Sequence, residues 1–152
     1  RGPSSCAGGS AQLMRAIGLD LGTKRIGVAV SDFSGTIASP HSVIHRSKSV
    51  RLDHQKILEL VIEEEAEIVI VGLPLLMSGT HGPAAKAATT EARRLSTVLS
   101  VPVEMFDERM TTVAADRVLK EAELSATARR QFVDKVAAAI MLQAWLERRR
   151  ST

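Results

Sequence analysis

The chain has 152 residues, a length typical of one domain with a full hydrophobic core. Its hydrophobic fraction of 45% and charged fraction of 24% are those of a soluble globular protein. No apolar run approaches the ~20 residues that a membrane-spanning helix needs, and the net charge of +3 is compatible with a nucleic-acid partner. A single cysteine, Cys6, allows no internal disulfide and favours a reducing compartment.

Residues 1–13 are rich in glycine, serine and alanine and lack the apolar segment of a secretory signal. We interpret them as a disordered leader of native or artificial origin, and Met14 can serve as the start of the native chain. Residues 14–152 are expected to form a single domain.

The stretch of residues 16–32 predicts two strands joined by a tight turn at residues 22–25. Strand residues alternate between faces, so one face of this pair is apolar and the other holds only small residues and Asp20. Glycine within a strand usually marks a place of close approach. Placing a carboxylate beside such an apolar surface costs free energy, which indicates that Asp20 has a functional role. The alternative is that Asp20 merely ends a strand under a tightly packed helix.

The apolar spacing along the rest of the chain predicts a third strand and then alternating helices and strands. The expected elements are strand 36–43, helix 52–65, strand 68–72, helix 83–99, strand 101–106, helix 111–122 and helix 125–149. Pro40 suits an edge strand, and the unbroken apolar run at 68–72 is typical of a parallel strand buried on both faces. The predicted fold is α/β: a mixed five-stranded sheet, three antiparallel strands and then two parallel ones, flanked by helices.

Carboxylates from three segments can meet in this fold. Asp134 lies on an apolar, alanine-rich face of the last helix, and small side chains permit close packing on the bare face of the first strands. That packing would bring Asp134 towards Asp20, although a surface position for Asp134 remains the alternative. Asp107 and Glu108 close the last strand on opposite faces, so only one can point at Asp20. The residues alone leave open which of the two does so.

Oxygen-rich sites of this kind suit Mg²⁺ or Mn²⁺ rather than zinc. A pair of such ions can activate water and stabilise the leaving oxygen in phosphodiester cleavage. Lys24, Arg25 and Arg109 lie next to the acids in the sequence, and we predict that they contact the phosphates of a nucleic acid. Three basic residues at 46–51 could extend this basic track. The alternative for each of these residues is a solvated surface charge.

Four motifs occur in order: GLDLGTKRIGVA at 18–29, VGLP at 71–74 with Gly-Thr at 79–80, DER at 107–109 with Thr-Thr at 111–112, and Val-Asp at 133–134 before an alanine-rich helix. With these motifs the chain resembles the YqgF/RuvX family, which is similar to Holliday-junction resolvases and has an RNase H-like fold. The resemblance runs from about residue 14 to the C-terminus. The Asp-Leu-Gly-Thr motif alone is weak evidence for this family, because many sugar and acetate kinases carry it.

The resemblance implies a nuclease that matures the 5′ end of pre-16S rRNA in the cytoplasm. It also implies that Asp20, Glu108 and Asp134 are the catalytic acids that bind Mg²⁺ or Mn²⁺, which selects Glu108 over Asp107. The expected partner is therefore a nucleic acid, either pre-rRNA or branched DNA.

The chain departs from its relatives at three positions. They commonly have Asn and Asp where this chain has Leu76 and Ser78, and often Glu where it has Ala114. These changes leave the acids intact and affect the loop contacts expected with the substrate.

Three other functions stay open at this point. They are a Holliday-junction resolvase acting on branched DNA, a nucleic-acid-binding module that does not cleave, and a small relative of the actin-like kinases. Such kinases need two domains of this type around a cleft, and one domain of this length cannot supply both.

Overall fold

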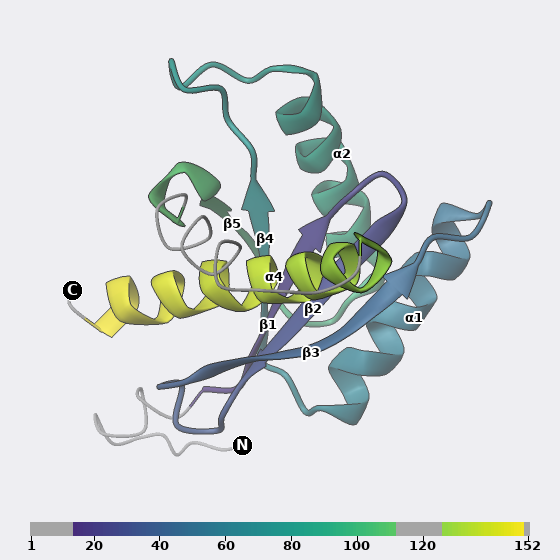
Figure 1. Cartoon of the computed structure of the whole chain (residues 1–152). Coiled ribbons are helices and arrows are strands. Elements are labelled where there is room, and N and C mark those ends of the chain that lie inside the picture. Colours follow the sequence, from purple (N-terminus) through teal and green to yellow (C-terminus); the bar gives the residue numbers. More distant parts are fainter. Residues whose placement is uncertain (1–13, 112–125, 151–152) are drawn as a thin grey trace.

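The computed structural model describes residues 14–111 and 126–150, with side chains in the last segment from Asp134 onwards. Five strands form one sheet in the order β3-β2-β1-β4-β5 (Figure 1). The strands are β1 (Ala16–Leu21), β2 (Arg25–Ser31), β3 (Ala38–His45), β4 (Ile68–Leu73) and β5 (Val103–Asp107). The helices are α1 (Val50–Glu63), α2 (Pro83–Val98), the short 3-10 helix η3 (Glu108–Thr111) and α4 (Ala126–Arg150).

The strand pairings confirm the predicted fold. β1 pairs with β2 and β2 with β3 in antiparallel fashion, whereas β4 lies parallel to both β1 and β5. β3 is an edge strand, as Pro40 predicts, and the register shifts where Pro40 lies opposite Ala29. The expected leader at 1–13 and all but the first residue of the expected helix at 111–122 lie outside the described residues, and that first residue, Thr111, ends η3.

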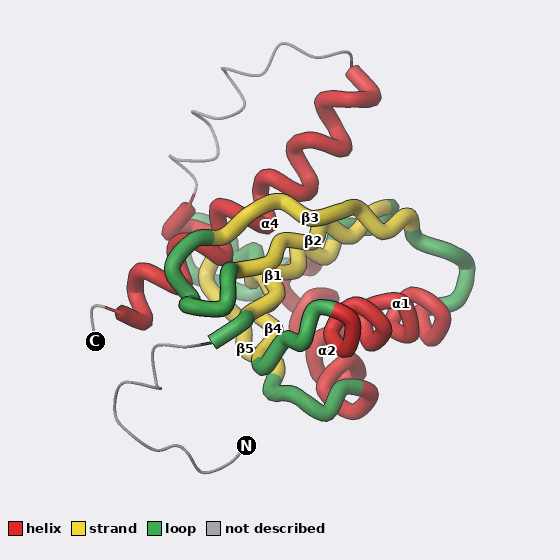
Figure 2. The backbone as a smooth tube through the Cα atoms, turned by 90° about the horizontal axis from the view of Figure 1, so that it is seen from below, coloured by secondary structure: helices red, strands yellow, loops and turns green. Residues whose placement is uncertain are grey.

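Helices cover both faces of the sheet. Figure 2 shows α4 on one side of the strands and α1 and α2 on the other. Side chains such as Ile17 and Leu19 belong to the core on the side of α1 and α2, whereas the alternate residue Ala16 belongs to the core beneath α4. None of the helices in the described part of the chain is long and apolar enough to cross a membrane.

Local sequence signals set the helix starts. The Ser49 side chain caps α1 by accepting a hydrogen bond from the Leu52 N–H at 3.2 Å. Pro83 occupies the first turn of α2, where its missing N–H costs nothing. Both helices begin near the end of the sheet where β1 and β4 end, since Val50 and Ala84 line the same pocket as Leu21 and Pro74.

The helix α4 rests directly on the backbone of the sheet. A Cβ atom at Gly27 would collide with the main-chain carbonyl of Asp134, and one at Gly18 would lie 2.9 Å from the Cβ of Leu142. Ala138 and Leu142 of α4 are fully buried at this contact. The predicted packing of the alanine-rich helix on the bare strand face is thus the packing that the protein adopts.

Gly27→Ala should destabilise the protein, because its methyl group would occupy the space of the Asp134 carbonyl and α4 would have to move outwards. We expect the free energy of unfolding to fall by about 1–3 kcal/mol, the usual range for overpacking. Urea denaturation would measure this loss. In the control Gly82→Ala the methyl group would meet only the flexible side chain of Leu76, with a loss of about 1 kcal/mol or less from weaker capping. Equal losses in both variants would contradict this account of the helix contact.

Candidate active site

Asp20 stands near the end of β1 between two residues that have no side chain. Its partner in β2 is Gly27. On the other side Val71 of β4 pairs with Leu19, so the next residue of β4, Gly72, lies beside Asp20. Asp20 is partly buried and faces α4, because it alternates with Leu19, which packs towards α1 and α2. The two glycines leave space above the sheet on both sides of this carboxylate.

Glu108 fills the space above Gly72. It is the first residue of η3, directly after the end of β5, and a Cβ atom at Gly72 would collide with its carboxyl group. The Glu108 and Asp20 carboxyl groups share a hydrogen bond, which requires a proton on one of them. This bond raises the pKa of Glu108 and lowers that of Asp20.

The surroundings of this pair favour the protonated form of both acids. Burial is the main cause that raises the pKa of Asp20 from 3.8 to about 6, and the negative charge of Asp134 adds to it. Burial likewise raises the pKa of Glu108 from 4.5 to about 7, with further contributions from the charges of Asp20 and Asp107. At neutral pH the site therefore holds carboxylates that gain from any nearby positive charge.

Asp134 approaches from α4 and is held by a cation. Its Oδ2 accepts a hydrogen bond from Nε of Arg25 at 2.5 Å, and the two side chains are about one quarter exposed. Within residues 14–111 and 126–150, no group of three or more histidine, cysteine or acidic side chains is arranged so that it could hold a metal ion. Asp20 and Glu108 are thus in direct contact, and Asp134 is their neighbour, bound to Arg25.

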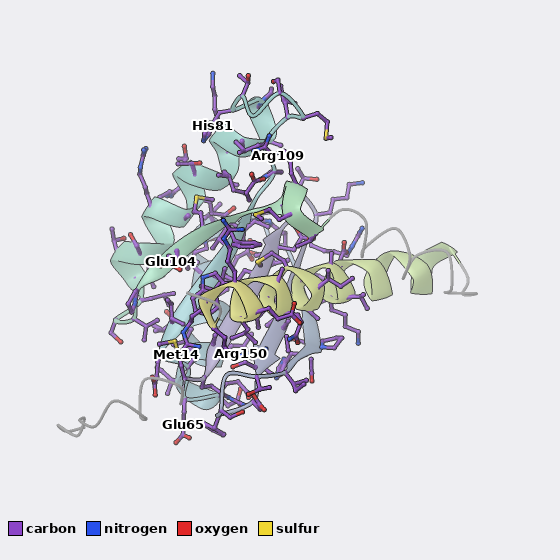
Figure 3. All side chains as sticks on the ribbon, turned by 90° about the vertical axis from the view of Figure 1, so that its left-hand side faces the viewer. Met14, Glu65, His81, Glu104, Arg109 and Arg150 are labelled. Carbon is purple, nitrogen blue, oxygen red and sulfur yellow. The ribbon has the colours of Figure 1, made fainter. Side chains whose placement is uncertain are left out.

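The other predicted contacts to nucleic acid lie around this site. Lys24 is exposed on the turn between β1 and β2. Arg109 is exposed and forms an ion pair with Asp107 at 2.6 Å, while its Nη1 donates to the carbonyl of Met77. In Figure 3 Arg109 lies at the same end of the molecule as His81 and opposite to Met14 and Glu65. The site therefore opens at the end of the sheet where β1, β4 and β5 terminate.

Sequence reasoning missed two parts of this site. Arg25 was expected to contact phosphate, and its ion pair with Asp134 joins residues too far apart in sequence for any local pattern. Gly72 makes room for Glu108, and its place in the VGLP motif at the end of a buried strand was the available signal. Asp107, the other candidate of the pair, turns to Arg109, which holds the pKa of Asp107 below its ordinary value.

Comparison with known proteins agrees with this arrangement. The sequence profile of the RuvX family, described as Holliday junction resolvase, matches residues 14–148. A protein of Moorella thermoacetica is 48% identical over 135 residues, covering 89% of this chain and 96% of the relative. One from Syntrophomonas wolfei is 46% identical over 134 residues, covering 88% and 94%. Both carry the name "Putative pre-16S rRNA nuclease".

Solved structures show the same fold at low sequence identity. RuvC of Thermus thermophilus aligns with a TM-score of 0.57 at 17% identity, covering 91% of this chain and 98% of RuvC. The same protein in complex with a Holliday junction substrate aligns with a TM-score of 0.55 at 21% identity, covering 91% and 97%. The five-stranded sheet with its helices is therefore the fold of a RuvC-type resolvase.

Asp20→Asn should stabilise the protein in EDTA at alkaline pH. The pKa of Asp20 is higher in the folded protein than its ordinary value of 3.8, so the stability it contributes is complete at about pH 4 and is lost as the pH rises towards 7. At about pH 8 the variant lacks the buried charge of Asp20, and we expect it to gain about 1–2 kcal/mol over the wild type after discounting for solvent screening. Thermal melts across this pH range would measure the difference.

Asp107→Asn is the control, because the carboxylate of Asp107 is stabilised by Arg109 rather than repelled. We expect its melting temperature to equal or fall below that of the wild type at alkaline pH. A melting temperature of Asp20→Asn below the wild type at about pH 8 would show that Asp20 serves as a structural end of β1.

Proposed function

The chain belongs to the RuvX family of Holliday junction resolvases, and on this premise we propose that it is a nuclease that processes the 5′ end of pre-16S rRNA. One observation carries the chemistry: Asp20 and Glu108 form a desolvated carboxyl pair at the end of β1, with Asp134 beside it. The substrate follows from relatives that are 46–48% identical over most of both chains and are named for pre-16S rRNA.

Branched DNA is the second candidate substrate. The description of the matched family names Holliday junction resolution, and this observation favours testing a four-way junction beside the rRNA. Both substrates are structured nucleic acids that present phosphates to the same end of the sheet.

We propose that Asp20, Glu108 and Asp134 are the catalytic acids and that they hold Mg²⁺ or Mn²⁺. The donor chemistry fits, because hard divalent cations prefer carboxylate oxygens and a bound cation would offset the cost of burying the charges of Asp20 and Glu108, whose pKa values burial raises. The acids would have to draw closer together, since no three of them in the described residues are arranged to hold a metal ion. Asp134 can contribute once its ion pair with Arg25 opens. When bound, such ions activate water and stabilise the leaving oxygen of a phosphodiester.

The basic residues around the acids would bind and orient the substrate. Lys24 projects from the turn after β1, and Arg109 is fixed by Asp107 at the end of β5. Arg25 can exchange its bond to Asp134 for a bond to phosphate, because a guanidinium recognises both kinds of oxygen. Cation contacts of this type position the backbone of a nucleic acid without reading its sequence.

The proposed substrate also implies where in the cell the protein acts. Pre-16S rRNA is processed in the bacterial cytoplasm, and we propose that the protein acts there. We further propose that residues 14–152 form one nuclease domain.

Replacing any one of the three acids by its amide should abolish cleavage while the fold remains. Asp20→Asn, Glu108→Gln and Asp134→Asn each remove one ligand oxygen and bury no additional surface. We expect a loss of at least about 100-fold in the single-turnover rate, measured in Mg²⁺ or Mn²⁺ on a labelled pre-16S rRNA fragment and on a four-way junction side by side.

Asp107→Asn is the matched control for Glu108→Gln, because it changes the adjacent acid, which is bound to Arg109 instead. Near wild-type cleavage by an amide variant would remove that residue from the catalytic set. Preference for the junction over the rRNA would make branched DNA the substrate, and binding without cleavage of either would leave a binding module.

Lys24→Ala should weaken nucleic-acid binding and reduce its dependence on salt. Each lost phosphate contact lowers the slope of log K against log salt by about 0.7–0.9, depending on strandedness. Filter binding across a salt series in EDTA measures the slope without cleavage. Lys56→Ala removes an exposed lysine on α1 and is the control for net charge. Identical slopes for the two variants would mean that the turn faces away from the substrate.

A further inference from the structure

The turn between β1 and β2 has few supports of its own. The N–H of Gly22 closes it by bonding the carbonyl of Arg25 at 2.9 Å, and the same N–H lies 3.1 Å from the carbonyl of Asp20. This turn carries Lys24, and Arg25 follows at the start of β2. Whatever holds the turn therefore sets the position of the cations proposed to contact the substrate.

Arg46 holds the turn from the side opposite to Asp134. Its Nε donates to the carbonyl of Gly22 at 2.9 Å, and its backbone N–H donates to the carbonyl of Lys24 at 2.9 Å. The sequence suggested that Arg46 belongs to an exposed basic track, but its side chain is only 15% exposed. The charge of Arg46 thus points inwards to the protein.

A network on α1 and α2 fixes the guanidinium of Arg46. Nη1 and Nη2 donate to the two carboxylate oxygens of Glu91 at 2.7 and 2.8 Å, a bidentate pair that allows one orientation. Nε2 of the buried His54 lies 2.8 Å from the same Glu91 carboxylate. Asp53 adds a buried carboxylate oxygen 3.9 Å from Arg46, with no hydrogen-bond partner among the described residues.

The space beneath the turn is not packed. A pocket of about 400 Å³ that opens to solvent lies there, and its lining includes Leu21, Gly22, Thr23, Arg46, Asp53 and Glu91. The turn therefore has no close-packed floor, and the Arg46 side chain spans the gap between it and the two helices. Without that side chain the turn has free volume into which it can move.

We propose that Arg46 is a positioning residue, which holds the turn so that Lys24 and Arg25 meet the substrate. This inference rests on the proposed function, because it concerns how the same site presents its cations. Arg46 acts through the turn and makes no contact with the substrate. Glu91 and His54 act one step further away, by orienting Arg46.

Arg15 provides a matched control at the other end of the sheet. Its side chain is 16% exposed, its Nη1 donates to the backbone carbonyl of Ser31 at 2.6 Å, and it forms an ion pair with Glu64. It precedes β1 and follows Met14, which lies at the end of the molecule opposite to Arg109 (Figure 3). Arg15→Met and Arg46→Met thus remove equivalent interactions, far from the site and next to it respectively.

The first readout is hydrogen exchange of the turn amides, which needs no substrate. We expect exchange at Gly22 to accelerate by at least about tenfold in Arg46→Met and to stay unchanged in Arg15→Met, because local opening limits protection. Equal protection of Gly22 in the two variants would overturn the proposal.

The second readout is a double-mutant cycle in nucleic-acid binding, measured in EDTA across a salt series. If Arg46 acts by presenting the turn, Arg46→Met lowers the salt slope by at least about 0.7–0.9, the change for one lost contact, and adding Lys24→Ala lowers it no further. The same addition in Arg15→Met should have its full effect. Independent losses in Arg46→Met and Lys24→Ala would overturn the proposal.

Arg46→Lys separates geometry from charge. An ammonium keeps the charge but cannot donate to Gly22 and to both oxygens of Glu91 in one plane. We expect this variant to behave like Arg46→Met. A salt slope equal to that of the wild type would overturn the positioning role. If the wild type binds neither pre-16S rRNA nor a four-way junction, the proposed function fails, and hydrogen exchange alone then decides whether Arg46 holds the turn.

Discussion

The contact between the backbone of α4 and the bare face of β1 and β2 is the constraint on which the rest of the structure depends. Because Gly27 has no side chain, the carbonyl of Asp134 can lie against the strand. That contact fixes how far the helix stands from Asp20, the partner of Gly27. The apolar cores on both faces supply the free energy of folding. The face of small residues on β1 and β2 sets the geometry of the acids.

The same crowding determines the electrostatics of the site. Glycines on both sides of Asp20 admit Glu108 from η3 and the helix that carries Asp134, so carboxylates gather where water is partly excluded. Burial then raises the pKa of the two acids in contact, and Arg25 neutralises the third. The fold accepts an electrostatic cost at this site, and the packing of the helices and strands elsewhere compensates for it.

Much of this could be predicted from the sequence, because it depended on periodicity and residue size. Alternation assigned Asp20 to the bare face, and the alanine-rich stripe predicted which helix would pack there. The choice between Asp107 and Glu108 could not follow from alternation, since Glu108 lies beyond the strand, in a 3-10 turn whose geometry strand rules do not describe. The inward orientation of Arg46 depends on contacts with two separate helices, which no local pattern records.

The ion pair between Arg25 and Asp134 joins residues 109 positions apart. A ribosome that adds 5–20 residues per second needs roughly 5–22 s to travel between them. During that interval the nascent chain already has the first strands and their acid, but it lacks the helix that completes the cluster. Translation order thus delays assembly of the three acids until synthesis has passed residue 134, so a growing chain lacks the complete acid cluster that we propose as its catalytic centre.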